Sequence, residues 1–143
     1  MTIRRLAPGD EALAQRLFQL FADVFEEDYH ALSLPYLSQL LIRADFWVLA
    51  AFLDDGIVGG ITAHRLPMTR AEVSELFIYD LAVAVDHQRK GIGRALVAQL
   101  RDAAAAEGID TAFVPADNED TYALDFYRAI GGTESPVTFF VFP

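Results

Sequence analysis

Residues 75–95 constrain the fold of this chain more than any other stretch, because a strand pattern changes there into a helix pattern across a basic turn. The apolar, β-branched and aromatic run over 75–85 is typical of a strand, and the alanine- and leucine-rich pattern after Arg94 is typical of a helix. The turn contains Gly91 and Gly93, which lack the Cβ atoms that would keep a ligand off the backbone. Backbone N–H groups at a helix start bind phosphate oxygens, aided by the helix dipole. The stretch therefore predicts a strand, a pyrophosphate-binding loop and a helix.

The spacing of the glycines distinguishes among phosphate-binding loops. The chain has no G-x-x-x-x-G-K-[ST] motif and no G-x-G-x-x-G followed by a ribose-binding acid. Instead, Gln88-x-x-Gly91-x-Gly93 matches the Q/R-x-x-G-x-G/A signature of the GNAT acetyltransferase superfamily, between the strand and the helix that the family pattern requires. The turn thus resembles a coenzyme A site rather than a nucleoside triphosphate or NAD site.

Composition limits the class of protein and of partner. At 143 residues the chain is long enough for one domain with a sizeable core, and it contains no cysteine, which removes disulfides and thiolate chemistry. We find no signal peptide and no membrane-spanning window, and we expect a cytoplasmic protein. A net charge of -10 argues against a nucleic-acid partner. The acidic field favours a cationic small molecule or a basic peptide, although it could equally serve solubility alone.

Hydrophobic periodicity and turn residues predict six strands and four helices. The hairpin signal Asp54-Asp55-Gly56 joins two antiparallel strands, and Ser33 and Asp10 are candidate N-caps. A strand, helix and parallel strand over 76–114 form a right-handed crossover. The expected strands are 2–6, 46–53, 57–65, 75–85, 111–114 (short and buried) and 137–142; the expected helices follow Asp10, Ser33, Gly91 and Asp120 and end near residues 26, 43, 107 and 130.

This order of elements, the glycine turn and Phe126-Tyr127-x-x-x-Gly131 together resemble a complete GNAT domain over residues 1–143. The resemblance implies an α/β (mixed α+β) acyl-CoA N-acyltransferase fold, with antiparallel N-terminal strands, a parallel pair at the cofactor cleft and helices on both faces. Within the superfamily, the stretch from Ser74 to Val83, with Ala116-Asp117 and Ala123-Leu124-x-x-Tyr127, resembles the type I aminoglycoside (gentamicin) 3-N-acetyltransferases.

The resemblance implies acetyl-CoA as co-substrate, in a V between the central strand and the next parallel strand. Pantetheine would pair with backbone at 81–83, and the pyrophosphate would meet 88–94. Such strands usually carry a bulge, here near Asp80, that directs a backbone N–H at the thioester carbonyl. The residues assigned to the cofactor are Leu81, Ala82, Val83, Gln88, Arg89, Lys90, Gly91, Ile92, Gly93 and Arg94.

Direct acetyl transfer requires a deprotonated amine and a reprotonated thiolate. Asp80, an acid inside an apolar strand, is our candidate for the base or for the group that orients the ammonium, and Tyr127 resembles the tyrosine that protonates the CoA thiolate. Glu75, Tyr79 and Asp117 are further candidates for the amine pocket, although acids at 117–120 also fit simple helix capping. The three histidines are unclustered and no serine lies in G-x-S-x-G, so we expect no metal and no serine nucleophile.

The sequence departs from the type I enzymes at its end, where Phe140 and Phe142 stand at the places of acids that would hold a polycationic sugar. The predicted function is therefore an N-acetyltransferase of a cationic amine, most specifically position 3 of an aminoglycoside, with a polyamine or a protein amine as the alternative. A non-catalytic acyl-CoA-binding module is the alternative of another class. The apolar end of the chain is compatible with a homodimer and with the core of a monomer.

Overall fold

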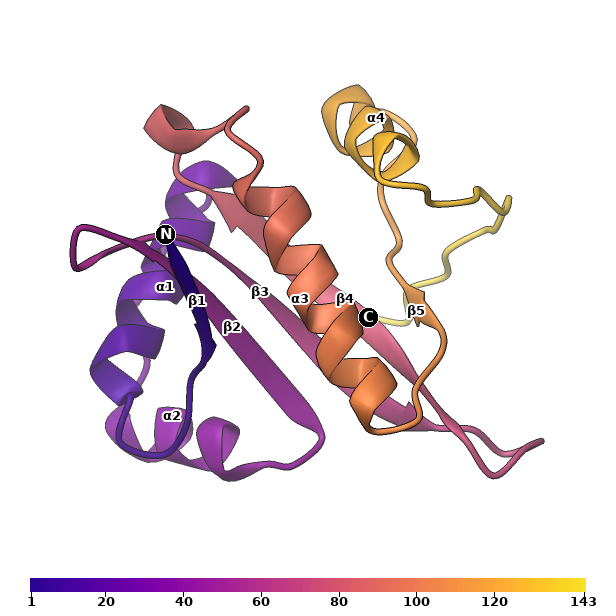
Figure 1. The fold of residues 1–143 in the computed structure, drawn as a ribbon, viewed down its shortest axis with the longest axis horizontal. Coiled ribbons are helices and arrows are strands. Elements are labelled where there is room, and N and C mark those ends of the chain that lie inside the picture. Colours follow the sequence, from indigo (N-terminus) through magenta and orange to yellow (C-terminus); the bar gives the residue numbers. More distant parts are fainter.

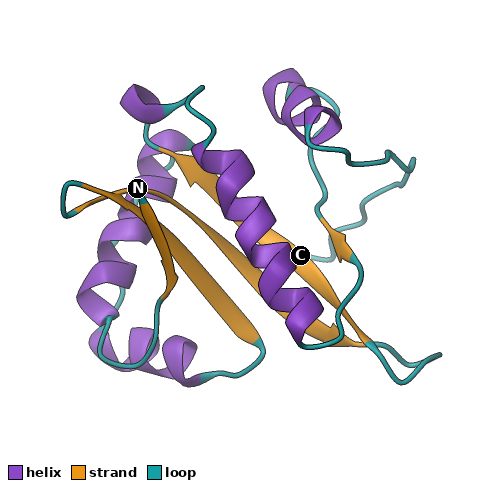
Figure 2. Cartoon of the chain, viewed as in Figure 1, coloured by secondary structure: helices purple, strands orange, loops and turns teal.

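A computed structural model describes all residues, 1–143, as one five-stranded mixed sheet with helices on both faces (Figures 1 and 2). The strands lie in chain order, β1-β2-β3-β4-β5; all neighbours are antiparallel except β4 and β5, which are parallel. The expected fold class is confirmed. The elements are β1 (Thr2–Arg5), α1 (Glu11–Val24), α2 (Leu34–Ile42), β2 (Phe46–Leu53), β3 (Gly56–Pro67), β4 (Ser74–Val83), the 3₁₀ turn η1 (Val85–His87), α3 (Ile92–Ala106), β5 (Ala112–Phe113) and α4 (Thr121–Ala129).

Local signals in the sequence account for the first half of the fold. Asp54 and Asp55 both have positive φ, 48° and 67°, as a two-residue hairpin turn between β2 and β3 requires. Ser33 caps α2 as expected, since its Oγ accepts the Tyr36 N–H at 3.3 Å. Asp10 occupies the N-cap of α1, but its carboxylate accepts the Ala7 N–H upstream and pairs with Arg4 instead of capping the helix.

Two hydrophobic clusters cover the two faces of the sheet. On one face α3 packs through Leu96 and Leu100, both fully buried, onto the centre of the sheet. On the other face α1 and α2 pack through Leu17 and Leu37 onto the β1–β3 side. Figure 1 shows α3 in front of the sheet and α1 and α2 behind its β1–β2 side. Helix α1 also reaches the end of β4, where Ala82 belongs to the same cluster, whereas Tyr79 of β4 and Phe113 of β5 remain exposed.

Strands β4 and β5 pair only at their beginning. Leu76 pairs with Ala112 and Phe77 with Phe113, and the two chains then diverge (Figure 2). From residue 78 onward, β4 pairs with β3 on one side and has no strand on the other. The V that the resemblance implied is present.

The end of the chain differs from the sequence prediction. The strand β5 has two residues rather than four, and it is not buried, since Phe113 is 38% exposed. The prediction of a strand over 137–142 is wrong, because residues 130–143 contain no helix and no strand. A strand needs a neighbour for its backbone groups, and a two-residue β5 offers almost none. No helix of the structure is both long enough and apolar enough to cross a membrane.

Candidate active site

The site is built around a bulge in β4. Thr62 of β3 is opposite Asp80, whereas the next residue, Ala63, is opposite Ile78, so Tyr79 is an extra residue in β4. The N–H of Asp80 donates to Oγ1 of Thr62 at 3.1 Å, and Thr62 is the one polar side chain in the buried core. Because of the bulge, Ile78 and Leu81 belong to the α3 face, and Tyr79 and Asp80 both lie on the α1/α2 face.

The bulge fixes which backbone amide can meet a thioester. The N–H of Asp80 points toward β3 and is already bonded, so it cannot polarise an acyl group in the V. Amides alternate between the two edges of an extended strand. The N–H of Leu81 is therefore the one directed at the open edge. The bulge lies near Asp80 as expected, and the candidate donor is the N–H of Leu81.

The carboxylate of Asp80 is partly buried and has no hydrogen-bond donor in the protein. Burial raises the pKa of Asp80 above its usual range, and the negative charge of Glu27 raises it further. A carboxylate with a raised pKa is a better proton acceptor, and one without a partner is free to bind an incoming ammonium. Its environment therefore suits either role expected of Asp80.

The charge of Glu27 acts on Asp80, although the sequence offered no reason to single it out from Glu26-Glu27-Asp28. Helix α1 ends in a Schellman motif: the N–H of Glu27 donates to the Ala22 carbonyl at 2.9 Å and that of Glu26 to the Asp23 carbonyl at 3.3 Å. Glu26 has φ 56°, at the position where glycine is usual. This tight turn brings Glu27 within electrostatic range of Asp80. A helix end with three acids looked like an ordinary solvated terminus.

Tyr127 of α4 is also brought near Asp80. Burial, together with the charges of Asp120 and Asp80, raises the pKa of Tyr127 to about 12. The hydroxyl therefore keeps its proton at neutral pH and can act as a donor. Asp120 itself caps α4 by accepting the Ala123 N–H at 3.0 Å.

The glycine turn leaves backbone N–H groups free at the start of α3. Gly91 caps the helix with φ 81°, and the first intrahelical bond is donated by Ala95 to the Gly91 carbonyl at 3.0 Å. The N–H groups of residues 91–94 therefore have no intrahelical acceptor. A Cβ on Gly91 would meet no atom within 4 Å, so the turn is open there. One on Gly93 would lie 3.2 Å from the ring of Phe126, so this glycine lets α4 approach α3 closely. The geometry fits a phosphate-bearing ligand.

Several side chains of the turn contact protein rather than open space. Gln88 donates to the Val83 carbonyl at 2.9 Å, and Arg94 donates to the Ala129 carbonyl at the end of α4 at 3.2 Å. The Arg89 guanidinium lies over the Tyr122 ring, 5.9 Å from its centroid. Lys90 is exposed at the same turn. The side chains of Gln88 and Arg94 thus shape the loop. The backbone N–H of Arg94 remains available to a phosphate, whereas that of Gln88 donates to the Val85 carbonyl at 3.4 Å.

Two predicted substrate residues lie apart from Asp80. Glu75 is at the start of β4, five residues upstream. Asp117 is exposed in the loop before α4, where its carbonyl accepts the Asp120 N–H at 3.0 Å. Neither carboxylate makes a hydrogen bond or an ion pair with Asp80 or Tyr127. The structure therefore brings Tyr127 within electrostatic range of Asp80, with Tyr79 next to Asp80 in β4, and shows no such link for Glu75 or Asp117.

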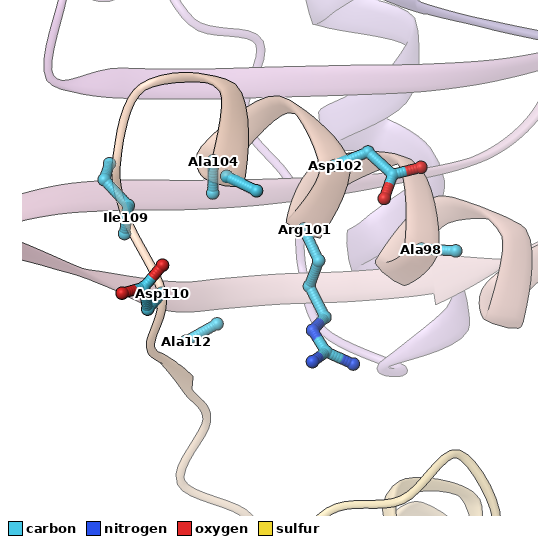
Figure 3. A pocket seen from close by; sticks show the side chains of 8 residues that line it. Ala98, Arg101, Asp102, Ala104, Ile109, Asp110 and Ala112 are labelled. Atoms are coloured by element: carbon cyan, nitrogen blue, oxygen red, sulfur yellow. The ribbon is translucent and has the colours of Figure 1, made fainter.

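The hollow in Figure 3 is separate from this site. It has a volume of about 370 Å³ and lies between the C-terminal half of α3 and β5, with Arg101, Asp102 and Asp110 among its lining residues. None of the predicted site residues lines it. No group of three or more His, Asp or Glu side chains is arranged to hold a metal ion.

Comparison with known sequences identifies the same class of protein. The sequence model of the acetyltransferase (GNAT) family matches residues 14–131. A [ribosomal protein bS18]-alanine N-acetyltransferase of Escherichia coli K12 is 29% identical over 70 residues, which cover 49% of this chain and 47% of that protein. The match therefore spans about half the length of this curated relative.

Solved structures resemble the whole chain. An aminoglycoside acetyltransferase, meta-AAC0020, from an uncultured soil metagenomic sample superposes with a TM-score of 0.95 and 37% identity in its complex with trehalose. The superposition covers 99% of this chain and 95% of that one. In complex with sisomicin, meta-AAC0020 gives a TM-score of 0.96, 36% identity and the same coverage.

Proposed function

This chain belongs to the GNAT family of acetyltransferases, and we propose that it is an acetyl-CoA-dependent enzyme that transfers acetyl directly to an amine of a cationic small molecule. The proposed acceptor is the 3-amino group of an aminoglycoside, and the proposed location is the cytoplasm. The observation that carries the proposal is the environment of Asp80. Its carboxylate is partly buried, has no partner and has a raised pKa, and Asp80 immediately precedes Leu81, whose N–H is directed at the open edge of β4 in the V.

The residues divide the chemistry between them. An alkyl ammonium loses its proton near pH 8 to 10, so an amine must be bound and deprotonated before it can attack. Asp80 would orient the ammonium and take its proton, with Tyr79 lining the pocket. Tyr127, still protonated at neutral pH, would donate to the departing thiolate sulfur. Acetyl-CoA supplies the activated acetyl group, held by the backbone of 81–83 and by the glycine turn.

Two observations bear on the choice of amine. The similarity to meta-AAC0020 extends over 99% of this chain and favours an aminoglycoside. The similarity to the E. coli ribosomal-protein N-acetyltransferase supports a protein amine as the second candidate, but over only 70 residues. Phe140 and Phe142 again stand where acids would hold a polycationic sugar, and both are exposed. Asp80 and Tyr127 lying together argue against a non-catalytic acyl-CoA-binding module.

The test of the function is a thiol-release screen with acetyl-CoA over sisomicin-type aminoglycosides, linear polyamines and basic peptides. We expect release above background with aminoglycosides, and mass spectrometry of the product would locate the acetyl group. Tight CoA binding without release for any amine would support the binding-module alternative. Release only with peptides would move the assignment to a protein amine.

The cofactor half has its own matched pair of variants. Asn and Asp both tolerate the left-handed conformation of Gly91 and have the same shape. We expect Gly91→Asp to weaken acetyl-CoA binding by tenfold or more, because it places a negative charge against the pyrophosphate, and Gly91→Asn to weaken it much less. Gly108→Asp repeats the charge and the backbone conformation at the other end of α3, where φ is 77° and a Cβ meets no atom within 4 Å. Equal CoA affinity of both Gly91 variants by calorimetry would refute the phosphate site.

A further inference from the structure

An aromatic row crosses four strands on the α1/α2 face of the sheet. Phe46, His64, Phe77 and Phe113 are direct neighbours in register on β2, β3, β4 and β5. Their ring centroids are 4.8, 6.5 and 5.0 Å apart in that order. Tyr79 joins them, 5.4 Å from His64 and 5.9 Å from Phe77. Directly opposed residues share one face of a sheet, so these rings form one continuous surface.

The part of this row beyond β2 is open. Phe46 is buried under the helices, but Tyr79 is 62% exposed and Phe113 is 38% exposed. We call His64, Phe77, Tyr79 and Phe113 the aromatic strip. Large exposed aromatic surfaces usually mark a binding site, and nothing in the sequence marked these residues as a group, because they come from three strands.

The strip begins beside Asp80 and runs away from the glycine turn. Along β4, the α1/α2 face presents Glu75, Phe77, Tyr79 and then Asp80, and the cofactor loop follows further on. An acceptor with one amine at Asp80 would have the acetyl donor on one side. The rest of a large acceptor can extend only toward the other side, over the aromatic strip.

The charges around the strip favour a cation. Asp80 lies at one end and Glu75 at the other, about 16 Å apart for five residues at about 3.3 Å each. Glu27 adds charge beside Asp80. Burial lowers the pKa of His64, so its ring is neutral at pH 7, and the neighbouring Arg65 is paired with Glu107 at 3.3 Å. The strip itself therefore carries no positive charge that would repel a polycation.

We propose that the aromatic strip binds the saturated rings of a polycationic acceptor, and that Glu75 binds a second ammonium group of the same molecule. This inference rests on the proposed function and adds a subsite to it. Aromatic faces attract both the C–H groups of saturated rings and nearby cations. The strip therefore selects amines carried on rings over linear polyamines of similar charge, which have the ammonium groups but little ring surface to stack.

The test compares sisomicin with spermidine as acceptors for Phe113→Ala and Glu75→Gln. We expect Phe113→Ala to raise the KM for sisomicin about three- to tenfold, with little change in kcat, in the KM for acetyl-CoA or in the KM for spermidine. Glu75→Gln should raise the sisomicin KM about two- to fivefold, and this effect should shrink with added salt. Tyr36→Ala, an aromatic 52% exposed on α2, and Glu72→Gln, an exposed acid of the β3–β4 loop, are the matched controls.

Other outcomes would overturn the proposal. If Phe113→Ala raises the KM equally for both amines, or leaves the KM for sisomicin unchanged, the strip does not recognise saturated rings. A change of oligomeric state in Phe113→Ala with an unchanged KM would assign the strip to a subunit interface. Phe113→Leu, which keeps the apolar volume, replaces the alanine variant if the latter fails to fold. If the wild-type protein acetylates neither amine, the proposed function fails. The aromatic strip is then tested by calorimetric binding of the same two amines. Phe113→Ala must weaken the binding of sisomicin and leave the binding of spermidine unchanged.

Discussion

Residues 1–109 and residues 110–143 differ in how they are packed. All 28 buried residues lie in the first region, and the last of them is Ile109. In the second region α4 has an amphipathic sequence but buries none of its residues completely. Four apolar residues near the chain end, Phe139 to Phe142, are between 73% and 93% exposed. One region is held by its own core, and the other has apolar surface that nothing in the monomer covers.

The candidate site draws on both regions. Asp80, Thr62 and the glycine turn belong to the packed region, so their geometry is fixed by the sheet and by α3. Tyr127 and Phe113 belong to the second region, which has few buried contacts to hold it. Segments with little buried surface open most readily. We therefore expect substitutions in the first region to affect chemistry and stability strongly, and those in the second to act more weakly.

The largest expected effect in the first region is that of Asp80→Asn on turnover. Asn keeps the shape of the side chain but loses the charge and the capacity to take a proton, and general base catalysis is commonly worth about 10²- to 10⁴-fold. We expect kcat to fall by well over tenfold with little change in acetyl-CoA affinity, measured by steady-state thiol release. Wild-type activity should also fall as the pH drops through the raised pKa of Asp80. Asp102→Asn removes the same charge from an exposed site on α3 and serves as the control.

The same substitution should stabilise the protein at neutral pH. Since the pKa of Asp80 is higher in the folded state than in the unfolded state, the folded state binds the proton more tightly and the ionised carboxylate costs stability. That cost is present above the folded-state pKa and disappears below the unfolded value of about 3.9. The Asp80→Asn protein should therefore melt at a higher temperature than wild type at pH 7 and at the same temperature at low pH.

The catalytic role has its own contradiction. A near-normal kcat of Asp80→Asn at saturating amine would refute Asp80 as the base, and a normal KM as well would leave Asp80 a purely structural residue.

A direct comparison of the two regions uses two large apolar side chains. Leu96 of α3 is fully buried against the sheet, so Leu96→Ala should lower the free energy of unfolding by about 2 to 5 kcal/mol. Phe142 is 93% exposed, and Phe142→Ala should change the free energy of unfolding by no more than about 0.5 kcal/mol. Urea unfolding at low protein concentration measures both. A cost for Phe142→Ala close to that of Leu96→Ala would contradict the comparison, since it would mean that the chain end is packed in the monomer.

The sequence predicted the first region well because its signals are local. The hairpin at Asp54-Asp55, the capping of α2 by Ser33 and the glycine turn before α3 each depend on a few adjacent residues. It could not give the faces of β4, because one extra residue at Tyr79 inverts the alternation of side chains. After this bulge, the Asp80 N–H donates to the hydroxyl of Thr62, which lies eighteen residues upstream in the sequence. Glu27 was missed because its role depends on where α1 ends relative to β4.

The second region was predicted less well because its elements depend on partners. The apolar, β-branched and aromatic run over 137–142 does resemble a strand, but a strand forms only where another strand can accept its hydrogen bonds. The short β5 provides two paired residues, and Pro136 and Pro143 bound the segment. Periodicity measures the tendency of a segment to pair, whereas the identity of its neighbour is a property of the assembled molecule.

In the second region, Tyr127→Phe should lower turnover by about tenfold, less than Asp80→Asn. The pKa of about 12 keeps the Tyr127 hydroxyl protonated, so phenylalanine removes a proton donor while preserving the ring. A thiolate with a pKa of about 8.5 leaves without full protonation more easily than an amine does, which limits the loss. Tyr122→Phe, on the exposed side of the same helix, is the control. An equal effect of the two variants on kcat would show that Tyr127 only helps to pack α4.

The smallest effect on the folded monomer, and the sharpest test of the second region, concerns the exposed chain end. Contiguous apolar patches of this kind on a monomer usually mark an interface, and a second copy of the chain would offer the same patch and the same free edge of β5 in return. We therefore predict a homodimer in which the chain ends contact each other or the partner's β5. Phe140→Ser should leave the unfolding free energy of the monomer within about 0.5 kcal/mol of wild type and should shift sedimentation velocity profiles from dimer to monomer. Val73→Ser, an exposed apolar residue of the β3–β4 loop, should shift neither. A wild-type protein that sediments as a monomer at every concentration would refute the dimer, and the apolar chain end would then be available to a different partner.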